Sequence, residues 1–155
     1  MRDMRRKDRE KPADFALGVA DTCAFAVMGT VNSDGSPYCI PLSLAREGEW
    51  LFFHCATEGH KTDNLKHSNR VCICCVGTSQ PIPEDYAMEY ESAVINGIAH
   101  EVTDREEKIH ALLLICQRYA PENMAGFEAA IESKLGRTAV WKIHIDEISG
   151  KARMK

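Results

Sequence analysis

The chain has 155 residues, a formal net charge of −4, and 45% hydrophobic and 27% charged residues. This length suits one domain, and the composition is that of an ordinary globular protein. The acidic balance argues against a nucleic-acid partner, although residues 1–11 are locally basic. No apolar run approaches the length of a membrane span, and the basic start lacks the apolar core of a signal peptide. We therefore expect a cytoplasmic protein without membrane contact.

Seven cysteines are present, an odd and high number. They lack the paired C-x-x-C units of a structural zinc site, so no metal site is expected. Strand alternation places Cys72 and Cys74 on one face and Cys75 on the other. We expect the cysteines to be free thiols that pack in the core as small hydrophobic side chains.

The first third of the chain predicts a charged, loosely held segment followed by a helix and strands. Residues 1–11 form that segment, and Pro12 suits the first position of a helix that ends near Asp21. Three strands are expected next, at residues 23–31, 37–46 and 50–55. Short turns join them, the first centred on the Asp-Gly pair at 34–35. Three strands with such short connections predict an antiparallel meander, which is typical of the start of a barrel.

The rest of the chain mixes short helices with longer strands. A helix is expected at 59–67, a strand at 71–77, a loop at 78–85 and a long strand at 86–102. Gly97 in that strand predicts a bend or bulge. Thr103 and Glu106 fit a capping box, so a helix should begin there and end before Pro121. A second helical segment at 124–135, a final strand at 138–145 and a polar tail complete the prediction. The expected fold is one α+β domain over 1–155, built mainly on an antiparallel barrel with short flanking helices.

The most informative stretch is residues 52–66, where a hydrophobic strand turns sharply into the first turn of a helix. Gly59 permits close backbone approach, and His60 and Lys61 add positive charge beside free N–H groups, which is typical of a phosphate cradle. The same pattern also fits an ordinary joint between strand and helix with solvated polar residues. No glycine-rich dinucleotide fingerprint, P-loop or nucleophile elbow occurs in the sequence.

Three segments in order carry a family resemblance: SDGSPYCIPLSLA, WLFFHCATEGHKTDNLK and SAVINGIAHEVTD. Together they resemble the FMN-binding split barrels related to pyridoxamine 5′-phosphate oxidase. The resemblance spans roughly residues 3–151 and is strongest to the branch of nitroimidazole-resistance (Nim-type) proteins. It implies a split barrel, an FMN cofactor whose phosphate lies at the strand–helix junction, and a homodimer.

The resemblance also implies a set of cofactor-binding residues. His60 and Lys61 match the family's basic phosphate-binding pair, although arginine often stands where His60 does, and Asn64 could donate to the same phosphate. The positions expected to contact the flavin ring are Pro37, Tyr38, Ile40, Pro41, Leu42, Phe53 and His54. Ser92 falls where the oxidase branch usually has glutamine.

His54 is the candidate catalytic residue. The Nim-type branch carries a histidine at this position beside the flavin, where it could donate a proton or bind a polar group of the substrate. A lone histidine on a strand is also commonly a structural residue, so both readings stay open.

The implied function is a flavin-dependent reductase that takes electrons from an external donor and passes them to a small nitro- or quinone-like acceptor. The chain lacks the C-terminal extension and arginine-rich end of the true oxidases, so oxidation of pyridoxamine phosphate is not expected. The alternative is a non-catalytic flavin-binding or redox-sensing module. Haem handling would call for a haem-contacting histidine and extra basic surface, which the sequence does not indicate.

Overall fold

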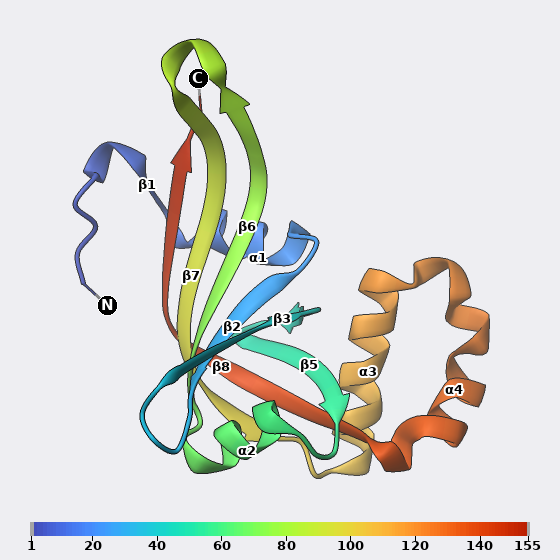
Figure 1. Ribbon diagram of the computed structural model, residues 1–155. Helices are drawn as coiled ribbons and strands as arrows, with labels where there is room; N and C mark the ends of the chain where they lie inside the picture. Colours follow the sequence, from blue (N-terminus) through green and yellow to red (C-terminus); the bar gives the residue numbers. More distant parts are fainter. Residues whose placement is uncertain (1, 155) are drawn as a thin grey trace.

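A computed structural model describes residues 2–154, so Met1 of the basic segment and Lys155 of the tail lie outside the described residues (Figure 1). The helices are α1 (Ala13–Thr22), α2 (His60–His67), α3 (Arg105–Tyr119) and α4 (Phe127–Lys134). The strands are β1 (Glu10–Lys11), β2 (Ala26–Val31), β3 (Pro37–Leu42), β4 (Ala45–Glu47), β5 (Trp50–Ala56), β6 (Arg70–Ile82), β7 (Ala87–Glu101) and β8 (Thr138–Arg153). Short 3₁₀ turns lie at Lys7–Arg9, Pro83–Asp85, Pro121–Gly126 and Leu135–Arg137.

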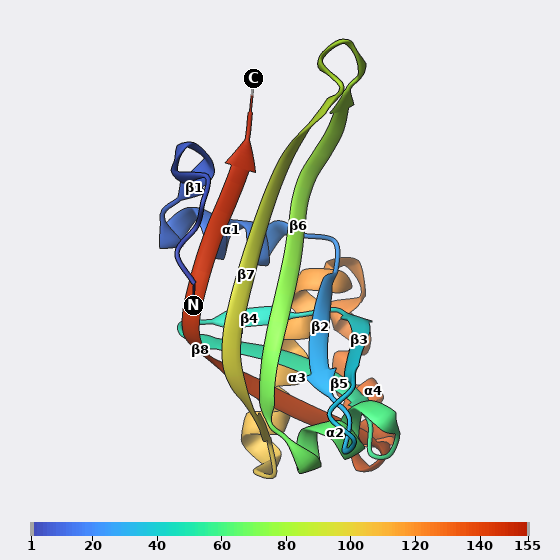
Figure 2. The ribbon, with the colours of Figure 1, turned by 60° about the vertical axis from the view of Figure 1, so that its left-hand side comes forward.

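All strand pairs are antiparallel, and the sheet order is β3-β2-β6-β7-β8-β5-β4, with β1 paired to β8. The long strands β6, β7 and β8 run side by side along the molecule (Figure 2). Helices α3 and α4 lie together on one side, and α2 lies at the end of β5 (Figure 1). The predicted α+β class with a mainly antiparallel sheet is confirmed.

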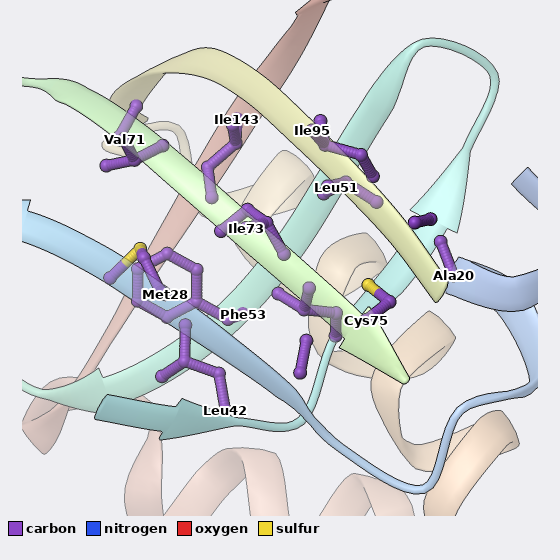
Figure 3. Close-up of a cluster of buried hydrophobic side chains, with 14 of the residues drawn as sticks. Ala20, Met28, Leu42, Leu51, Phe53, Val71, Ile73, Cys75, Ile95 and Ile143 are labelled. Carbon is purple, nitrogen blue, oxygen red and sulfur yellow. The ribbon is translucent and has the colours of Figure 1, made fainter. Parts of the chain in front are cut away.

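The core has two parts because β5 buries both of its faces. Leu51 and Phe53 point into the main cluster, where they meet Met28 and Ile73 from the sheet (Figure 3). Phe52, on the other face of β5, packs in a second cluster with side chains of α3. Full burial of each such side chain contributes about 1.5–3 kcal/mol.

Gly97 lies at a bulge in β7, as predicted, because the pairing of β7 with β8 shifts register between Asn96 and Gly97. A Cβ atom at Gly97 would lie 2.1 Å from the carbonyl oxygen of His144 and 2.8 Å from Cγ2 of Ile143. Only glycine allows the two strands to approach this closely.

The predicted three-stranded meander is wrong. The expected strand 37–46 divides into β3 and β4, and these lie at opposite ends of the sheet order. β3 pairs with β2, while β5 pairs with β4 and β8. Local turn signals cannot reveal this outcome, because β8, the second partner of β5, begins more than eighty residues later in the chain.

Two segments predicted to lack regular structure are strands. Residues 79–82, expected in a loop, pair with residues 87–90, so the turn shrinks to Pro83–Asp85. Residues 146–153, expected in a polar tail, belong to β8, where residues 147–153 pair with β7. Both segments are too polar to read as strands, and it is the neighbouring backbone of β7 that pairs with them.

The N-terminal segment is more ordered than predicted. Glu10 and Lys11, expected in a loosely held segment, pair with Lys151 and Gly150 of β8. Pro12 is the N-cap of α1 rather than its first helical residue.

Three further details also differ from the prediction. The cap of α3 is Asp104, whose Oδ2 accepts a 2.8 Å hydrogen bond from the backbone N–H of Glu107, in place of the Thr103 capping box. The expected helix 124–135 is a 3₁₀ turn followed by α4. Of the cysteines, all of them free, only Cys23 and Cys75 are buried, whereas Cys39 and Cys72 are exposed.

Candidate functional site

A cavity of about 230 Å³ lies where β3, β5 and the N-terminus of α2 meet. It is lined by Tyr38, Ile40, Cys55, Ala56, Glu58, Gly59, His60, Lys61 and Thr62. We call it the α2 cavity. The residues come from three elements because β5 ends beside β3 and the chain turns there directly into the helix.

The backbone at the start of α2 presents unpaired donors to this cavity. The N–H of Asp63 bonds to the carbonyl oxygen of Gly59 at 3.0 Å, so the N–H groups before it have no partner within the helix. Gly59 has a backbone φ of 135°, a conformation that residues other than glycine rarely adopt. These donors and the positive end of the helix dipole favour an anion.

Asn32 fixes α2 against the turn between β2 and β3. Its Oδ1 lies 2.6 Å from Nε2 of His60 and accepts a 2.8 Å bond from Nδ2 of Asn64. Asn64 is buried, and its Nδ2 also donates to Oγ1 of Thr30 at 3.1 Å. The amide of Asn64 therefore anchors the helix. Sequence reasoning missed Asn32 because it treated residues 32–36 only as a turn.

His60 and Lys61 both line the α2 cavity, but their side chains make different contacts. The ring of His60 stacks on Tyr38, with ring centroids 4.0 Å apart and planes 31° apart. Because the Asn32 oxygen can only accept, Nε2 of His60 carries the hydrogen in that bond. Nδ1 can then donate only when the ring is protonated. The Nζ of Lys61 lies 5.7 Å from the centre of the Phe53 ring.

His54 lies on the opposite face of β5 from Phe53 and lines a separate cavity of about 220 Å³. That cavity is mostly apolar, with side chains from α3 and α4 such as Leu112, Cys116 and Phe127. The His54 residue is exposed by surface area, but these side chains partly desolvate its ring and so lower its pKa, and the nearby charge of Lys61 lowers it further. Both effects favour the neutral form of the imidazole.

The structure thus brings together Tyr38, Ile40, His60 and Lys61, but not all the residues that the resemblance implied. Pro37 and Pro41 are exposed, while Tyr38 and Ile40, with which they alternate along β3, are partly buried. Leu42 and Phe53 belong to the main core cluster. Ser92 does not line the cavity, and its hydroxyl donates to the carbonyl oxygen of Lys151 at 3.3 Å. Cys55, Glu58 and Thr62 line the cavity and were not predicted.

The described residues lack two kinds of feature. Between residues 2 and 154, no three His, Cys, Asp or Glu side chains gather closely enough to hold a metal ion. Over the same range, no helix is both long and apolar enough to span a membrane.

The family model for pyridoxamine 5′-phosphate oxidase matches residues 17–152. The chain belongs to this family. A candidate 5-nitroimidazole antibiotic resistance protein from Bacteroides thetaiotaomicron is 26% identical, with a TM-score of 0.79 over 91% of this chain and 84% of that one. The predicted resemblance to the Nim-type branch is thereby confirmed, and so is the split barrel.

More distant structures share the fold. The flavocytochrome Anf3 from Azotobacter vinelandii is 19% identical, with a TM-score of 0.84 over 99% of this chain and 73% of that one. The FAD and haem binding protein from Mycobacterium smegmatis is 19% identical, with a TM-score of 0.80 over 95% of this chain and 74% of that one. A search of curated proteins finds no match to this chain.

Proposed function

We propose that this family member binds FMN with its phosphate in the α2 cavity and acts, as a cytoplasmic homodimer, as a reductase of a small nitro- or quinone-like acceptor. The observation that carries the proposal is the α2 cavity itself. Its free N–H groups, the Lys61 side chain and the Gly59 backbone converge at the start of one helix.

The residues present fit a phosphate group. The helix N–H groups supply hydrogen bonds and Lys61 supplies a full charge. His60 would contribute only in its protonated form, because its Nε2 hydrogen is already given to Asn32. Tyr38 and Ile40 would hold the adjoining part of the cofactor. When bound, FMN supplies electron or hydride transfer, and the protein sets its position and access.

His54 would act on the acceptor rather than on the phosphate. As a neutral imidazole it can offer one N–H hydrogen bond to a nitro or carbonyl oxygen, and its lowered pKa disfavours the imidazolium form that could release a proton. A candidate nitroimidazole-resistance protein at 26% identity supports an acceptor of this kind. FAD-binding proteins among the structural neighbours support a flavin in this fold.

The first test compares FMN and riboflavin binding in wild type and Lys61→Ala. Loss of a charge-assisted hydrogen bond of about 1.5–3 kcal/mol should weaken FMN binding roughly ten- to a hundred-fold. Riboflavin has no phosphate and should bind both proteins equally. Lys66→Ala removes an exposed lysine at the other end of α2 and is the matched control. Equal FMN affinity in wild type and Lys61→Ala would remove the phosphate site.

A non-catalytic flavin-binding or redox-sensing module is the second candidate, and the position of His54 favours it. His54 lines a different cavity from Lys61, so the predicted catalytic histidine is not in the wall of the α2 cavity. Steady-state oxidation of NADH or NADPH by the FMN-loaded protein, with and without a nitroaromatic compound or a quinone, separates the two. Acceptor-dependent oxidation supports the reductase, and tight FMN binding without turnover supports the module.

A further inference from the structure

The cavity of about 220 Å³ that His54 lines is bounded by α3, α4 and β5, on the other face of β5 from the α2 cavity (Figure 1). His54 lines this cavity while the next residue, Cys55, lines the α2 cavity, because successive side chains of a strand point to opposite faces. We call it the α4 cavity. In its wall Leu112 and Ile115 of α3 are buried, whereas Lys134 of α4 is exposed and therefore lies at the rim.

Helix α4 presents one face to this cavity. Phe127, Ala130, Ile131 and Lys134 all line it, and their spacing of i, i+3, i+4 and i+7 places them on one side of a helix. No residue of α4 is fully buried. The helix therefore covers the cavity without filling it, and the lining side chains lack contacts that a close-packed core provides.

The size and the apolar wall of the α4 cavity fit one aromatic ring. A dry cavity of roughly 150 Å³ lined by Leu, Ile and Phe side chains is large enough to bind benzene. The α4 cavity is somewhat larger and has Leu112, Ile115 and Phe127 in its wall. The side chain of Phe127 also offers a ring against which a second ring can pack. The remaining volume suits a substituent of a few atoms.

The charge at the rim favours an anionic substituent. Lys134 is fully charged at neutral pH, and the described residues that line the cavity include no carboxylate. Between residues 2 and 154, no ion pair joins Lys134 to an acidic side chain. The charge of Lys61 also reaches this side of β5, where it acts on His54. A ligand carboxylate beside Lys134 would therefore meet an attractive field.

We propose that the α4 cavity binds an aromatic carboxylate with a single ring. The ring lies between α3, α4 and β5, and the carboxylate lies at the rim beside Nζ of Lys134. The site needs no flavin and does not depend on the proposed function.

The first experiment titrates the flavin-free wild-type protein with benzoate at neutral pH and follows the histidine ring signals by NMR. His54 lines the α4 cavity and His60 lines the α2 cavity, so the two rings report on the two sites separately. We expect a saturable shift of the His54 signals with little change at His60. A larger shift at His60 would place benzoate in the α2 cavity and overturn the proposal, as would the absence of a saturable shift at His54.

A comparison of ligands separates the ring from the charge. Benzoate should bind more tightly than acetate, which has no ring, and more tightly than benzyl alcohol, which has no charge. It should also bind more tightly than hexanoate, whose apolar part is a flexible chain that loses more conformational freedom on binding. Equal affinity for benzyl alcohol would contradict the role of charge, and tighter binding of hexanoate would contradict the preference for a ring.

Blocking the cavity tests its location. Ala130→Phe adds a ring at the rim and should weaken benzoate binding roughly ten-fold or more, because the added side chain takes up the space of the ligand. Ala129→Phe is the matched control, since Ala129 is an exposed residue of α4 that does not line the cavity. Benzoate affinity equal to wild type in a folded Ala130→Phe protein would overturn the proposal.

Removing the rim charge tests the carboxylate contact. Lys134→Met keeps a long apolar side chain and should weaken benzoate binding roughly two- to five-fold, the range for an exposed ion pair. Binding of benzyl alcohol should not change. Arg137→Met removes an exposed charge that does not line the cavity and is the control. An equal loss in both variants would contradict a contact between Lys134 and the carboxylate.

A pair of variants separates this site from the proposed FMN site. Lys61→Ala should weaken FMN binding and largely retain benzoate binding, whereas Ala130→Phe should do the reverse. Parallel loss of both ligands in Lys61→Ala would place them in one cavity and overturn the proposal. Benzoate binding at His54 in a protein that does not bind FMN would support the α4 cavity and contradict only the proposed function.

Discussion

Lys61 influences two cavities from one position. Its side chain lines the α2 cavity, and its charge also depresses the pKa of His54, which lines the neighbouring cavity on the other face of β5. Binding of a phosphate beside Lys61 would partly neutralise that charge. We therefore expect the pKa of His54 to rise when an anion occupies the α2 cavity, which NMR titration of the histidine ring can follow with inorganic phosphate as the probe.

His54 should also make stability depend on pH. Its pKa in the folded protein lies below the unfolded value of about 6.5, so the unfolded chain binds more protons as the pH falls through that value. The free energy of unfolding should therefore be highest above about pH 6.5 and fall as the solution becomes more acidic. His54→Gln should flatten this part of the curve in urea unfolding measured across pH. An equally steep curve in the variant would contradict the assignment.

Sequence reasoning found the residues of the α2 cavity that are local to the strand–helix junction, His60 and Lys61, and family resemblance added Tyr38 and Ile40. It could not find Asn32, because the bond from Asn32 to His60 joins a turn to a helix that lies far along the chain. The side of β5 on which His54 lies also escaped prediction. β5 is apolar on both faces, so alternation of polar and apolar residues gives no signal there.

At the scale of elements, close contact between β7 and β8 depends on Gly97. Gly97→Ala places a methyl group against the carbonyl of His144, so we expect it to destabilise the protein by about 1–3 kcal/mol or more. Gly18→Ala is the matched control, because nothing lies within 4 Å of a Cβ there and alanine favours the helix by about 1 kcal/mol. The urea unfolding midpoints of the two variants should move in opposite directions. An unchanged midpoint for Gly97→Ala would refute the close approach of β7 and β8 at this residue.

Asp104 and Thr103 are neighbouring candidates for the cap of α3, and substitutions at the two positions should differ in their effect on stability. Asp104→Ala removes the side chain that accepts from the backbone N–H of Glu107, so it should cost about 0.5–2 kcal/mol. Thr103→Ala, at the position that the sequence motif indicated, should change the free energy of unfolding little. Thermal unfolding of both variants checks this, and a larger loss for Thr103→Ala would restore the capping box.

The elements themselves were largely predictable, and their partners were not. Hydrophobic periodicity and turn residues located all four helices and most strands, because these signals act over a few residues. The pairing of β5 with β8, and the extension of β8 through a polar segment, follow from contacts across the whole chain. The family resemblance implied a split barrel but did not supply this pairing or the full length of β8.

At the scale of the whole molecule, one face of the sheet remains uncovered. We call it the outer face, and it consists of Val27, Val31, Cys39, Pro41, Cys72, Cys74 and Val76 on β2, β3 and β6. Val31 is 39% exposed and Val76 is 50% exposed. Contiguous apolar surface of this kind commonly forms an interface between copies of a protein.

We expect the protein to be a dimer through the outer face. Val76→Lys should shift it toward the monomer in light scattering, because the one interface of a two-fold dimer would bury an unpaired charge from each copy. Ser133→Lys, which adds the same charge to α4, should leave the mass unchanged. A monomeric wild-type protein at micromolar concentration, or a dimeric Val76→Lys, would rule out this interface.

The place of β8 in the sheet has a consequence for synthesis on the ribosome. β8 is inserted between β7 and β5, yet it follows both of them in the chain. Until it emerges, β5 and β7 each present an unsatisfied edge, and such edges can pair with other nascent chains. The hairpins β2–β3 and β6–β7 can form early, but the barrel can be completed only after β8 has emerged. The interval before β8 emerges is therefore when we expect this protein to depend most on chaperones.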